Sequence, residues 1–393
     1  IGEDGAAGLG AEAKRLIAEA EIVFGGARHL ALAGSLIRGE ARSWPTPFDP
    51  DMSAVRALAG RKVCVLASGD PFLFGVGATL ARVISPGEIH ALPAPSSFSL
   101  AASRLGWPLQ SVETVSLHGR SPDLLRPFLH PGRRVLALTS DGHGPARIAA
   151  LLSDNGFGGS LMHVLEALGG PGERVRTCKA DAFDLGDIAP LNLLGIEVVA
   201  APGARILPLA AGLDDALFEH DGQLTKREVR AVTLSSLAPR RGEFLWDIGA
   251  GSGSISIEWM LADPSLRAVA VEADPARAER IARNAAACGV PGLEIVNGAA
   301  PAALETLAAP EAIFVGGGGS DPGVMEAAVA ALKPGGRLVA NAVTLEMEAV
   351  LLALEARHGG ALMRIAISRA GPVGAMTGWR AAMPVTQWTW TKP

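Results

Sequence analysis

The chain has 393 residues, which exceeds the length at which one hydrophobic core keeps growing, so two domains are expected. Hydrophobic residues make up 49% of it and charged residues 19%, a composition that argues against a disordered chain. With 35 basic and 40 acidic residues, the net charge of −5 gives no electrostatic basis for binding nucleic acid.

The spacing of the cysteines and the lengths of the apolar runs indicate in which cellular compartment the protein is expected. The three cysteines are widely spaced and form no Cys/His cluster, so we expect neither a metal site nor a disulfide framework. Such a pattern is typical of a reducing compartment. No apolar run approaches the roughly 20 residues of a membrane-spanning helix, and the N-terminus does not have the pattern of a signal peptide. We therefore expect a cytoplasmic protein with no membrane partner.

From residue 61 to about residue 200, short β-branched runs alternate with Ala- and Leu-rich stretches, which predicts an α/β domain. The predicted strands are Arg61–Ala67, Glu88–Pro93, Val112–Leu117, Arg133–Thr139, Leu161–Leu165, Glu173–Lys179 and Ile196–Ala200. The predicted helices are Val76–Ile84, Ser97–Leu105, Pro122–Leu129 and Pro145–Leu152. No long helix separates the last two strands, so we expect this domain to end on a partly antiparallel sheet.

A looser stretch rich in Pro, Gly and Ala then precedes a second α/β series. We place the first domain at residues 1–201, a linker at 202–222 and the second domain at 223–393. The strands predicted in the second domain are Phe244–Ile248, Ala268–Glu272, Leu293–Val296, Ala312–Val315, Arg337–Asn341, Leu362–Ser368 and Val385–Thr391. Its predicted helices are Lys226–Leu237, Ile255–Leu261, Pro275–Cys288, Gly323–Leu332 and Leu345–Arg357. This pattern predicts a doubly wound, Rossmann-like sheet of about seven strands, with the last two paired as a hairpin.

A glycine-rich loop follows the first strand of the second domain and precedes a helix. It places Gly249, Gly251 and Gly253 at alternate positions, which lets the backbone approach a nucleotide-like ligand. A dinucleotide fingerprint would have its third glycine at position 254, which is Ser254. The loop therefore favours S-adenosylmethionine (SAM), with a dinucleotide or a purely structural turn as the alternatives.

Two acidic residues accompany this loop. Glu272 ends the next strand, where a carboxylate can accept hydrogen bonds from both ribose hydroxyls, as in either cofactor class. Asp247 lies two residues before the first glycine, where SAM enzymes commonly have an acid and dinucleotide enzymes an apolar residue. At this point the sequence resembles the class I methyltransferase family. The resemblance extends to residues 314–319, so it implies that Gly317 and Gly318 face the substrate, unless this glycine run is only a flexible loop.

Two further stretches narrow the resemblance. Residues 224–230 and 297–301 are similar to the decarboxylating precorrin methyltransferase domain of cobalamin biosynthesis. The resemblance implies that Thr225 and the backbone near Ala300 contact SAM. Ala299 stands where that family usually has Asp, which puts a carboxylate contact to the adenine in doubt. Thr225 is also a candidate N-cap, since Glu228 lies at the capping-box spacing.

The first domain carries a different set of motifs. A Gly-Asp-Pro turn at residues 69–71 follows a strand and is a weak signal alone, since many such turns are structural. Together with residues 93–97, 105–108, 117–120 and 166–170 it resembles the tetrapyrrole methylase family, with a two-lobed fold whose first strand is truncated here. The resemblance implies a SAM pocket between the lobes lined by Gly69, Asp70, Leu73, Ser96 and Ser97, with Thr139 a weaker candidate.

His118 and Arg120 are the polar residues that we expect nearest the substrate of the first domain. A precorrin carries many carboxylates, and an arginine offers a bidentate fork to each. The alternative is a solvated turn after a strand.

The order of the two domains resembles the fused precorrin methyltransferases. This resemblance implies methylation at carbon 5 by the first domain, and methylation at carbon 15 with decarboxylation of the ring C acetate by the second. It also implies one SAM per domain, a precorrin partner and a homo-oligomer. The rival hypotheses are an RNA or protein methyltransferase with an accessory SAM-binding module, an NAD-dependent oxidoreductase and a SAM-binding scaffold. No catalytic acid or base is identified, and Glu258, His143 and His358 are candidates by residue type only.

Overall fold

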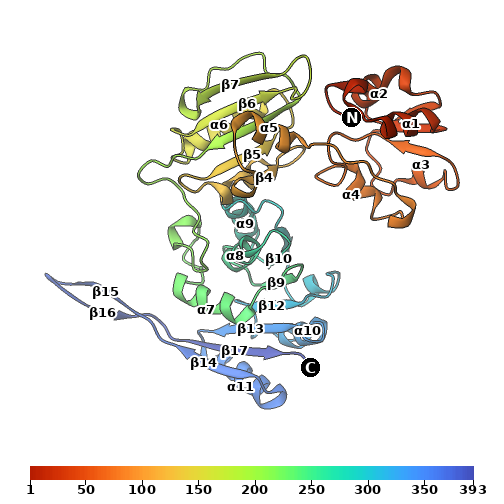
Figure 1. Cartoon of the computed structure of the whole chain (residues 1–393). Coiled ribbons are helices and arrows are strands. Elements are labelled where there is room, and N and C mark those ends of the chain that lie inside the picture. Colours follow the sequence, from red (N-terminus) through yellow and green to blue (C-terminus); the bar gives the residue numbers. More distant parts are fainter. The chain divides into compact units, whose positions relative to one another are not determined.

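The computed structural model describes residues 1–393, which divide into two compact units, Ile1–Ala204 and Arg205–Pro393 (Figure 1). None of its helices combines the length and apolar character needed to cross a membrane. Each unit is described by itself below.

The first part of unit 1 is a three-stranded parallel sheet in the order β2-β1-β3. Its central strand is apolar throughout: Val23 enters one hydrophobic cluster, whereas Ile22 and Phe24 enter another. This alternation buries both faces of the sheet, as expected for a parallel sheet covered on both sides. The elements are α1 Ala11–Glu19, β1 Ile22–Gly25, α2 Ala27–Ala33, β2 Glu40–Ser43, α3 Ser53–Arg56, β3 Val63–Val65 and α4 Val76–Leu80.

The second part of unit 1 is a five-stranded sheet in the order β4-β5-β8-β6-β7. β4 and β5 are parallel, whereas β8 is antiparallel to both β5 and β6, and β6 to β7, which confirms the partly antiparallel sheet expected from the sequence. The elements are α5 Ser97–Leu105, β4 Glu113–Ser116, β5 Arg134–Leu138, α6 Gly144–Asp154, β6 Leu161–Glu166, β7 Arg174–Lys179 and β8 Asn192–Glu197.

Three predicted elements of unit 1 differ in the structure. The strand predicted at Ile196–Ala200 is β8, which spans Asn192–Glu197. Glu88–Pro93 was predicted as a strand, but Pro86–Glu88 forms a short 3-10 helix and the following residues pair with no strand. β3 is an edge strand of this sheet, and the apolar stretch does not pair with it; the Ile89 N–H instead donates to the Pro86 carbonyl within the short helix, at 3.2 Å. Pro122–Phe128 is a 3-10 helix rather than an α-helix, and Pro127 inside it has no backbone N–H to donate.

Unit 2 is built on a seven-stranded sheet in the order β11-β10-β9-β12-β13-β17-β14, which confirms the doubly wound prediction. β17 runs antiparallel to β13 and β14, as expected for the closing hairpin. The strands are β9 Phe244–Ile248, β10 Arg267–Glu272, β11 Glu294–Asn297, β12 Ala312–Val315, β13 Arg337–Ala342, β14 Ala361–Ile365 and β17 Val385–Thr391. The helices are α7 Arg227–Leu237, α8 Ser254–Ala262, α9 Pro275–Ala287, α10 Val324–Ala331 and α11 Leu345–His358.

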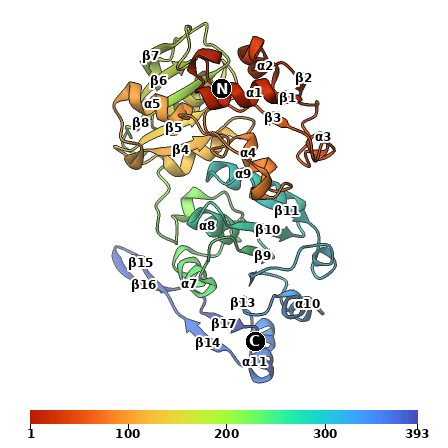
Figure 2. The ribbon, with the colours of Figure 1, turned by 45° about the vertical axis from the view of Figure 1, so that its right-hand side comes forward.

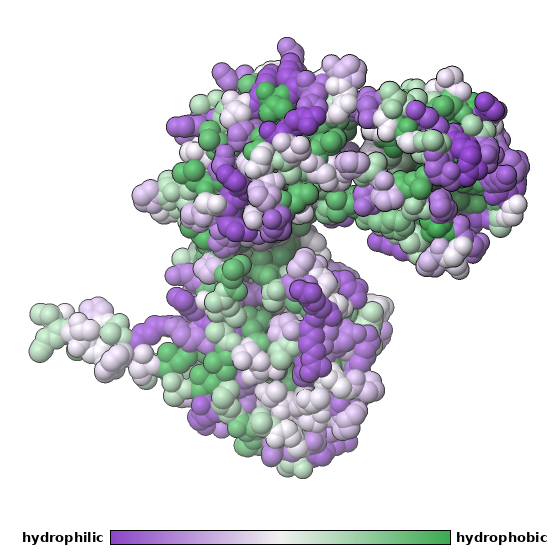
Figure 3. Space-filling view, viewed as in Figure 1, coloured by the Kyte–Doolittle hydropathy of each residue, from purple (hydrophilic) through white to green (hydrophobic).

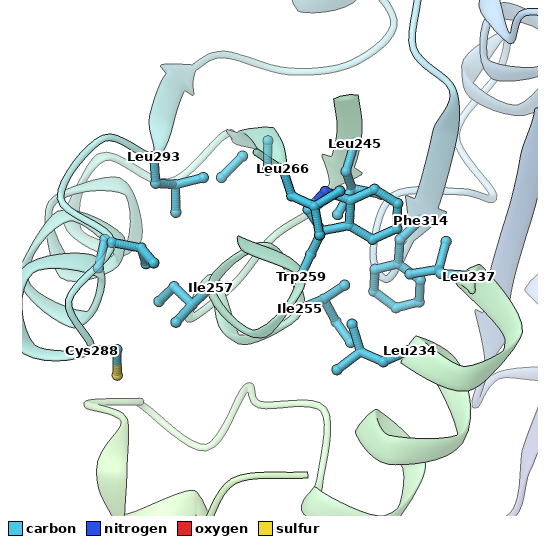
Figure 4. Packing of buried hydrophobic residues seen from close by; sticks show 14 of the residues in the cluster. Leu234, Leu237, Leu245, Ile255, Ile257, Trp259, Leu266, Cys288, Leu293 and Phe314 are labelled. Carbon is cyan, nitrogen blue, oxygen red and sulfur yellow. The ribbon is translucent and has the colours of Figure 1, made fainter. Parts of the chain in front are cut away.

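Two hydrophobic clusters cover the two faces of this sheet. Leu245 of β9 belongs to one cluster, whereas Phe244 and Trp246 belong to the other. Figure 4 shows the first cluster, in which Trp259 of α8 packs among aliphatic side chains near Phe314 of β12. Burial on both faces explains why the central strands are continuous apolar runs.

The stretch that we expected to be a linker, residues 202–222, contributes to the core of unit 2. Leu207, Leu213 and Phe218 are each at most 4% exposed and belong to the cluster of Figure 4. The stretch is irregular apart from a short 3-10 helix at Asp215–Leu217. Its apolar residues therefore follow no helical or strand period, which is why the sequence pattern does not reveal their burial.

A two-stranded antiparallel arm, β15 Ser368–Val373 and β16 Met376–Ala381, lies between β14 and β17 in the sequence. Figures 1 and 2 show it projecting away from the seven-stranded sheet, and Figure 3 shows it as an extension of the surface. The prediction of a strand at Leu362–Ser368 captured β14 but not this arm. Exposed apolar side chains near its tip, Val373 and Met376, give no period that marks a core.

Candidate active sites

The glycine loop of unit 2 connects β9 to α8 in the left-handed backbone region. Gly249, Gly251 and Gly253 have φ angles of +68°, +62° and +75°, which non-glycine residues rarely adopt. A Cβ atom on Gly249 would lie 2.7 Å from the backbone Cα and carbonyl carbon of Gly317. The loop after β9 and the loop after β12 are thus in direct backbone contact, which only glycine permits.

These two loops line a cavity of about 650 Å³. The predicted site residues that line it share small size or a position at the carboxyl end of a strand: Thr225, Gly249, Gly251, Glu272, Ala300, Gly317 and Gly318. The sheet brings them together because the carboxyl ends of β9, β10 and β12 meet at one edge.

Gly253 does not line this cavity. It is the N-cap residue of α8, and a Cβ atom there would lie 2.7 Å from the Cγ2 atom of Ile281 in α9. The structure therefore gives Gly253 a packing role between two helices rather than a place beside the cavity.

Glu272 is buried at the end of β10, with its carboxylate directed to the glycine loop. Its Oε2 atom accepts a hydrogen bond from the Gly251 N–H at 2.8 Å, and Oε1 accepts one from the Asp274 N–H at 3.0 Å. Each carboxylate oxygen can accept a second hydrogen bond. Glu272 can therefore hold the loop and still bind two hydroxyl groups.

Asp247 lies beneath the loop, outside the cavity lining. Its Oδ2 atom accepts hydrogen bonds from the backbone N–H and hydroxyl of Ser256, at 3.1 and 2.5 Å. Its Oδ1 atom is buried without a partner, and burial raises the pKa of Asp247 to about 6. Asp247 therefore does not reach the cavity, and what fits a ribose-bearing cofactor such as SAM is the glycine cradle that a Cβ atom would fill and the free acceptor capacity of Glu272.

Thr225 lies just before α7 and does not cap it. The helix has Lys226 as its N-cap residue, with no side-chain cap, so the capping-box alternative is wrong. Glu228 instead forms an ion pair with Arg369. The carbonyl of Thr225 accepts a hydrogen bond of 2.5 Å from Arg230 Nη1, which fixes the backbone at the cavity wall.

The residues considered for acid or base chemistry do not meet at this cavity. Glu258 is buried against Arg230 and lies outside the cavity lining, and His358 packs on the ring of Trp390, 5.4 Å between centroids. His143 belongs to unit 1. The cavity is lined in addition by Asn341 and Arg369, which the sequence analysis did not select because they lie in strands without a recognisable motif.

Unit 1 has its own cavity, of about 490 Å³, lined by residues of the five-stranded sheet and by helices and loops of both parts of the unit. It brings together all the predicted cofactor residues of this unit and one of the two predicted substrate residues: Gly69, Asp70, Leu73, Ser96, Ser97, Thr139 and His118. Arg120 is exposed and does not line it.

The Gly69 turn packs directly on the start of α5. Gly69 has a φ of +54°, and a Cβ atom there would lie 2.9 Å from the Cα atom of Ser96. Ser96 caps α5 by accepting the Ser99 N–H at 3.1 Å, and Asp70 accepts the Phe72 N–H at 2.8 Å. Side chains thus stabilise the turns here, and the cavity wall is mostly backbone and small residues.

Two basic residues of α2 also line this cavity, and no motif marked them. Arg28 forms an ion pair with Glu3, and His29 Nε2 lies 2.8 Å from the Ser68 hydroxyl. Burial and the neighbouring guanidinium of Arg28 lower the pKa of His29 to about 4, so its imidazole is neutral at pH 7. On the other wall, His118 Nδ1 lies 3.2 Å from the Thr139 carbonyl.

Comparison with known proteins finds relatives of both parts. Residues 1–184 match the Tetrapyrrole (Corrin/Porphyrin) Methylases, and residues 216–392 match the Precorrin methyltransferase domain. A cobalt-precorrin-6B C(15)-methyltransferase (decarboxylating) of Salmonella typhimurium is 38% identical over 158 residues, 39% of this chain and 80% of that protein.

Two relatives match the whole chain. The precorrin-6Y C(5,15)-methyltransferase [decarboxylating] of a Sinorhizobium species is 67% identical over 100% of this chain and 95% of that protein. The Mycobacterium tuberculosis protein of the same name is 42% identical over 100% of this chain and 98% of its own length. The chain therefore belongs to the family of decarboxylating precorrin-6Y C5,15-methyltransferases.

Proposed function

We propose that the chain transfers methyl groups from SAM to carbons 5 and 15 of a precorrin and decarboxylates the ring C acetate, in cobalamin biosynthesis. Unit 1 acts at carbon 5, and unit 2 acts at carbon 15 and removes the carboxylate. The observation that carries this proposal is that each unit has a separate cavity built on its own glycine turn, at Gly69 and at Gly249. The Salmonella relative is named for carbon 15 and decarboxylation alone. Its match to this chain is 158 residues long, which is shorter than either unit.

Each unit is proposed to bind one SAM. In unit 2, Glu272 binds the ribose hydroxyls, and the backbone of the loop at Gly249 and Gly251 lies against the cofactor. Thr225 and Ala300 complete the wall of the cavity. In unit 1, the turns at Gly69 and Ser96 hold the cofactor largely through backbone groups. When bound, SAM supplies a methyl group already activated on a sulfonium.

The chain's own part in the reaction is alignment rather than strong acid–base chemistry. Gly317 and Gly318 present backbone at the cavity wall without bulk, which lets a flat macrocycle approach the cofactor. In unit 1, His118 lines the cavity beside Thr139 and is proposed to face the substrate. The assignment of residues 1–201 and 223–393 to two separate domains, a cytoplasmic location and a homo-oligomeric state stay predictions.

The test uses two variants of the full chain, each directed at one cavity. In Gly69→Val the new side chain collides with Ser96, and in Glu272→Ala the ribose ligand of unit 2 is lost. Calorimetric titration with S-adenosylhomocysteine should give two equivalents for the wild type, one for Gly69→Val, and one unchanged and one weakened site for Glu272→Ala. Mass spectrometry should then show that Gly69→Val adds one methyl group to precorrin-6Y with loss of carbon dioxide, and that Glu272→Ala releases carbon dioxide more slowly than the wild type at limiting SAM. Two methyl groups added by Gly69→Val would overturn the assignment.

A further inference from the structure

The cavity of unit 2 has a second wall, opposite in character to its glycine loops. Ile365 at the end of β14, Ile367 just before β15, and Ala382 and Met383 after β16 line it. These residues form the base of the β15–β16 arm, where the chain leaves and rejoins the seven-stranded sheet (Figures 1 and 2). The cavity therefore runs from a polar, glycine-lined end to an apolar wall at the base of the arm.

Arg369, the second residue of β15, is the cation at this apolar wall. Its Nε atom donates to Glu228 Oε1 at 3.3 Å, and its Nη2 atom donates to Glu228 Oε2. The two side chains are 48% and 45% exposed, so the pair is open to solvent. The guanidinium thus makes a two-point fork to a carboxylate at the edge of the cavity.

This pairing is easily exchanged. An exposed ion pair contributes only about 0–1 kcal/mol, so releasing Glu228 to water costs little. Arg380 lies directly opposite Arg369 in the register of the arm, but its guanidinium donates to the Pro372 carbonyl at 2.6 Å, so it does not compete for Glu228. The hydrogen bond from Arg369 lowers the pKa of Glu228, so its carboxylate is ionised at neutral pH and competes for the fork.

We propose that Arg369 anchors a peripheral carboxylate of the substrate, and that Glu228 occupies the guanidinium fork until the substrate replaces it. This inference rests on the proposed function of unit 2. A precorrin combines an apolar ring with acetate and propionate groups at its rim. The isoleucines and Met383 contact the ring, and Arg369 binds a rim carboxylate through two hydrogen bonds. The exchange involves no covalent bond.

The other cations of the cavity are less suited to this role. Arg277 donates to Asp221 at 2.9 Å and lies in α9, beside the glycine loop. Lys226 lies 3.9 Å from Asp215 and offers a point charge rather than a fork. Only Arg369 joins a planar fork to the apolar wall.

The test compares four variants of the full chain: Arg369→Gln, Arg369→Lys, Glu228→Gln and the control Arg364→Gln. Arg364 is an exposed arginine of β14, paired with Glu348 at 3.1 Å and outside the cavity lining. Steady-state rates of methylation of precorrin-6Y at carbon 15 and of carbon dioxide release from its ring C acetate give KM and kcat, and S-adenosylhomocysteine titration gives cofactor affinity.

Substitutions of the two partners of the ion pair are expected to change KM differently. Arg369→Gln should raise KM by about tenfold or more, the usual effect of losing a charge-assisted hydrogen bond, with kcat and cofactor affinity little changed. Arg369→Lys should give an intermediate KM, and Arg364→Gln the wild-type value. Glu228→Gln should lower KM or leave it unchanged, because it removes the competitor.

A merely structural latch between the arm and α7 would behave differently. Glu228→Gln and Arg369→Gln would then raise KM to the same extent, since either variant opens the latch, and this result would overturn the inference. An unchanged KM in Arg369→Gln would do so as well. Both results presuppose that the wild type converts precorrin-6Y, so failure of the proposed function itself would be seen first, in the wild-type assay.

Discussion

Arg230 of α7 and Glu258 of α8 form a buried ion pair between the two helices of unit 2, the guanidinium Nε donating to the carboxylate. Arg230 is fully buried, and the other oxygen of Glu258 accepts the Gly212 N–H at 2.6 Å. The same guanidinium reaches the carbonyl of Thr225 at the cavity wall. The pair therefore ties the irregular segment before α7 to the body of the unit.

We expect Glu258→Ala to destabilise unit 2 by about 3 kcal/mol, the lower end of the range for breaking a buried ion pair, because the buried Arg230 keeps only Asp215, at 3.1 Å, as a carboxylate partner. Glu258→Gln retains one acceptor oxygen and should lose less. Glu219→Ala, in an exposed pair with Arg283, is the control and should cost at most about 1 kcal/mol. Urea denaturation measures all three. A Glu258→Ala variant of normal stability that no longer turns over substrate would instead support a catalytic role for Glu258.

The buried carboxyl of Asp247 should make the stability of unit 2 depend on pH. Burial raises its pKa from 3.8 to about 6, so the folded state binds the proton more tightly than the unfolded state. The stability from this group is present below about pH 4 and is lost as pH rises through about 6. Asp247→Asn removes this dependence. The free energy of unfolding of the variant minus that of the wild type, measured in urea, should therefore rise by on the order of 3 kcal/mol between pH 4 and pH 7. If this difference does not change with pH, Asp247 does not titrate in that range.

Loss of the Glu272 carboxylate should weaken SAM binding in unit 2. We expect Glu272→Ala to reduce the binding free energy by roughly 1.5–3 kcal/mol, the usual range for charge-assisted hydrogen bonds. The control is Glu294→Ala, which changes an exposed glutamate at the start of β11 and should leave affinity unchanged. Isothermal titration of S-adenosylhomocysteine checks both, and equal affinities for the two variants would contradict the ribose assignment.

Gly249 is expected to tolerate no side chain, for a reason beyond its backbone angle. Gly242 also has a positive φ, of +82°, but a Cβ atom there meets nothing within 4 Å. Gly242→Ala should therefore cost only the left-handed strain, roughly 1–2 kcal/mol. Gly249→Ala should cost roughly a further 1–3 kcal/mol and weaken cofactor binding, because it pushes the Gly317 loop away. Thermal unfolding with and without S-adenosylhomocysteine separates the two effects, and equal losses in both variants would contradict the close contact.

The amino-acid sequence is sufficient to predict the two α/β patterns and the strand–glycine loop–helix order around Gly249. These features are local: a buried parallel strand is a short apolar run, and a left-handed turn requires glycine within a few residues of it. The seven-stranded sheet of unit 2 follows from the same patterns and is confirmed. The motifs that contain Gly69 and Ser96 are likewise recognised from a few neighbouring residues each, and the structure places both residues at the same cavity.

Only the tertiary structure decided which residues without a motif reach the cavities. Arg369 and Glu228 are 141 positions apart, and their pairing depends on where the arm leaves the sheet. Glu258 was a candidate by residue type, but its partner Arg230 lies 28 positions away on another helix. Leu207 and Phe218 are buried although no period marks them. Side-chain pairing between distant elements depends on packing geometry, which composition and periodicity do not encode at any single position.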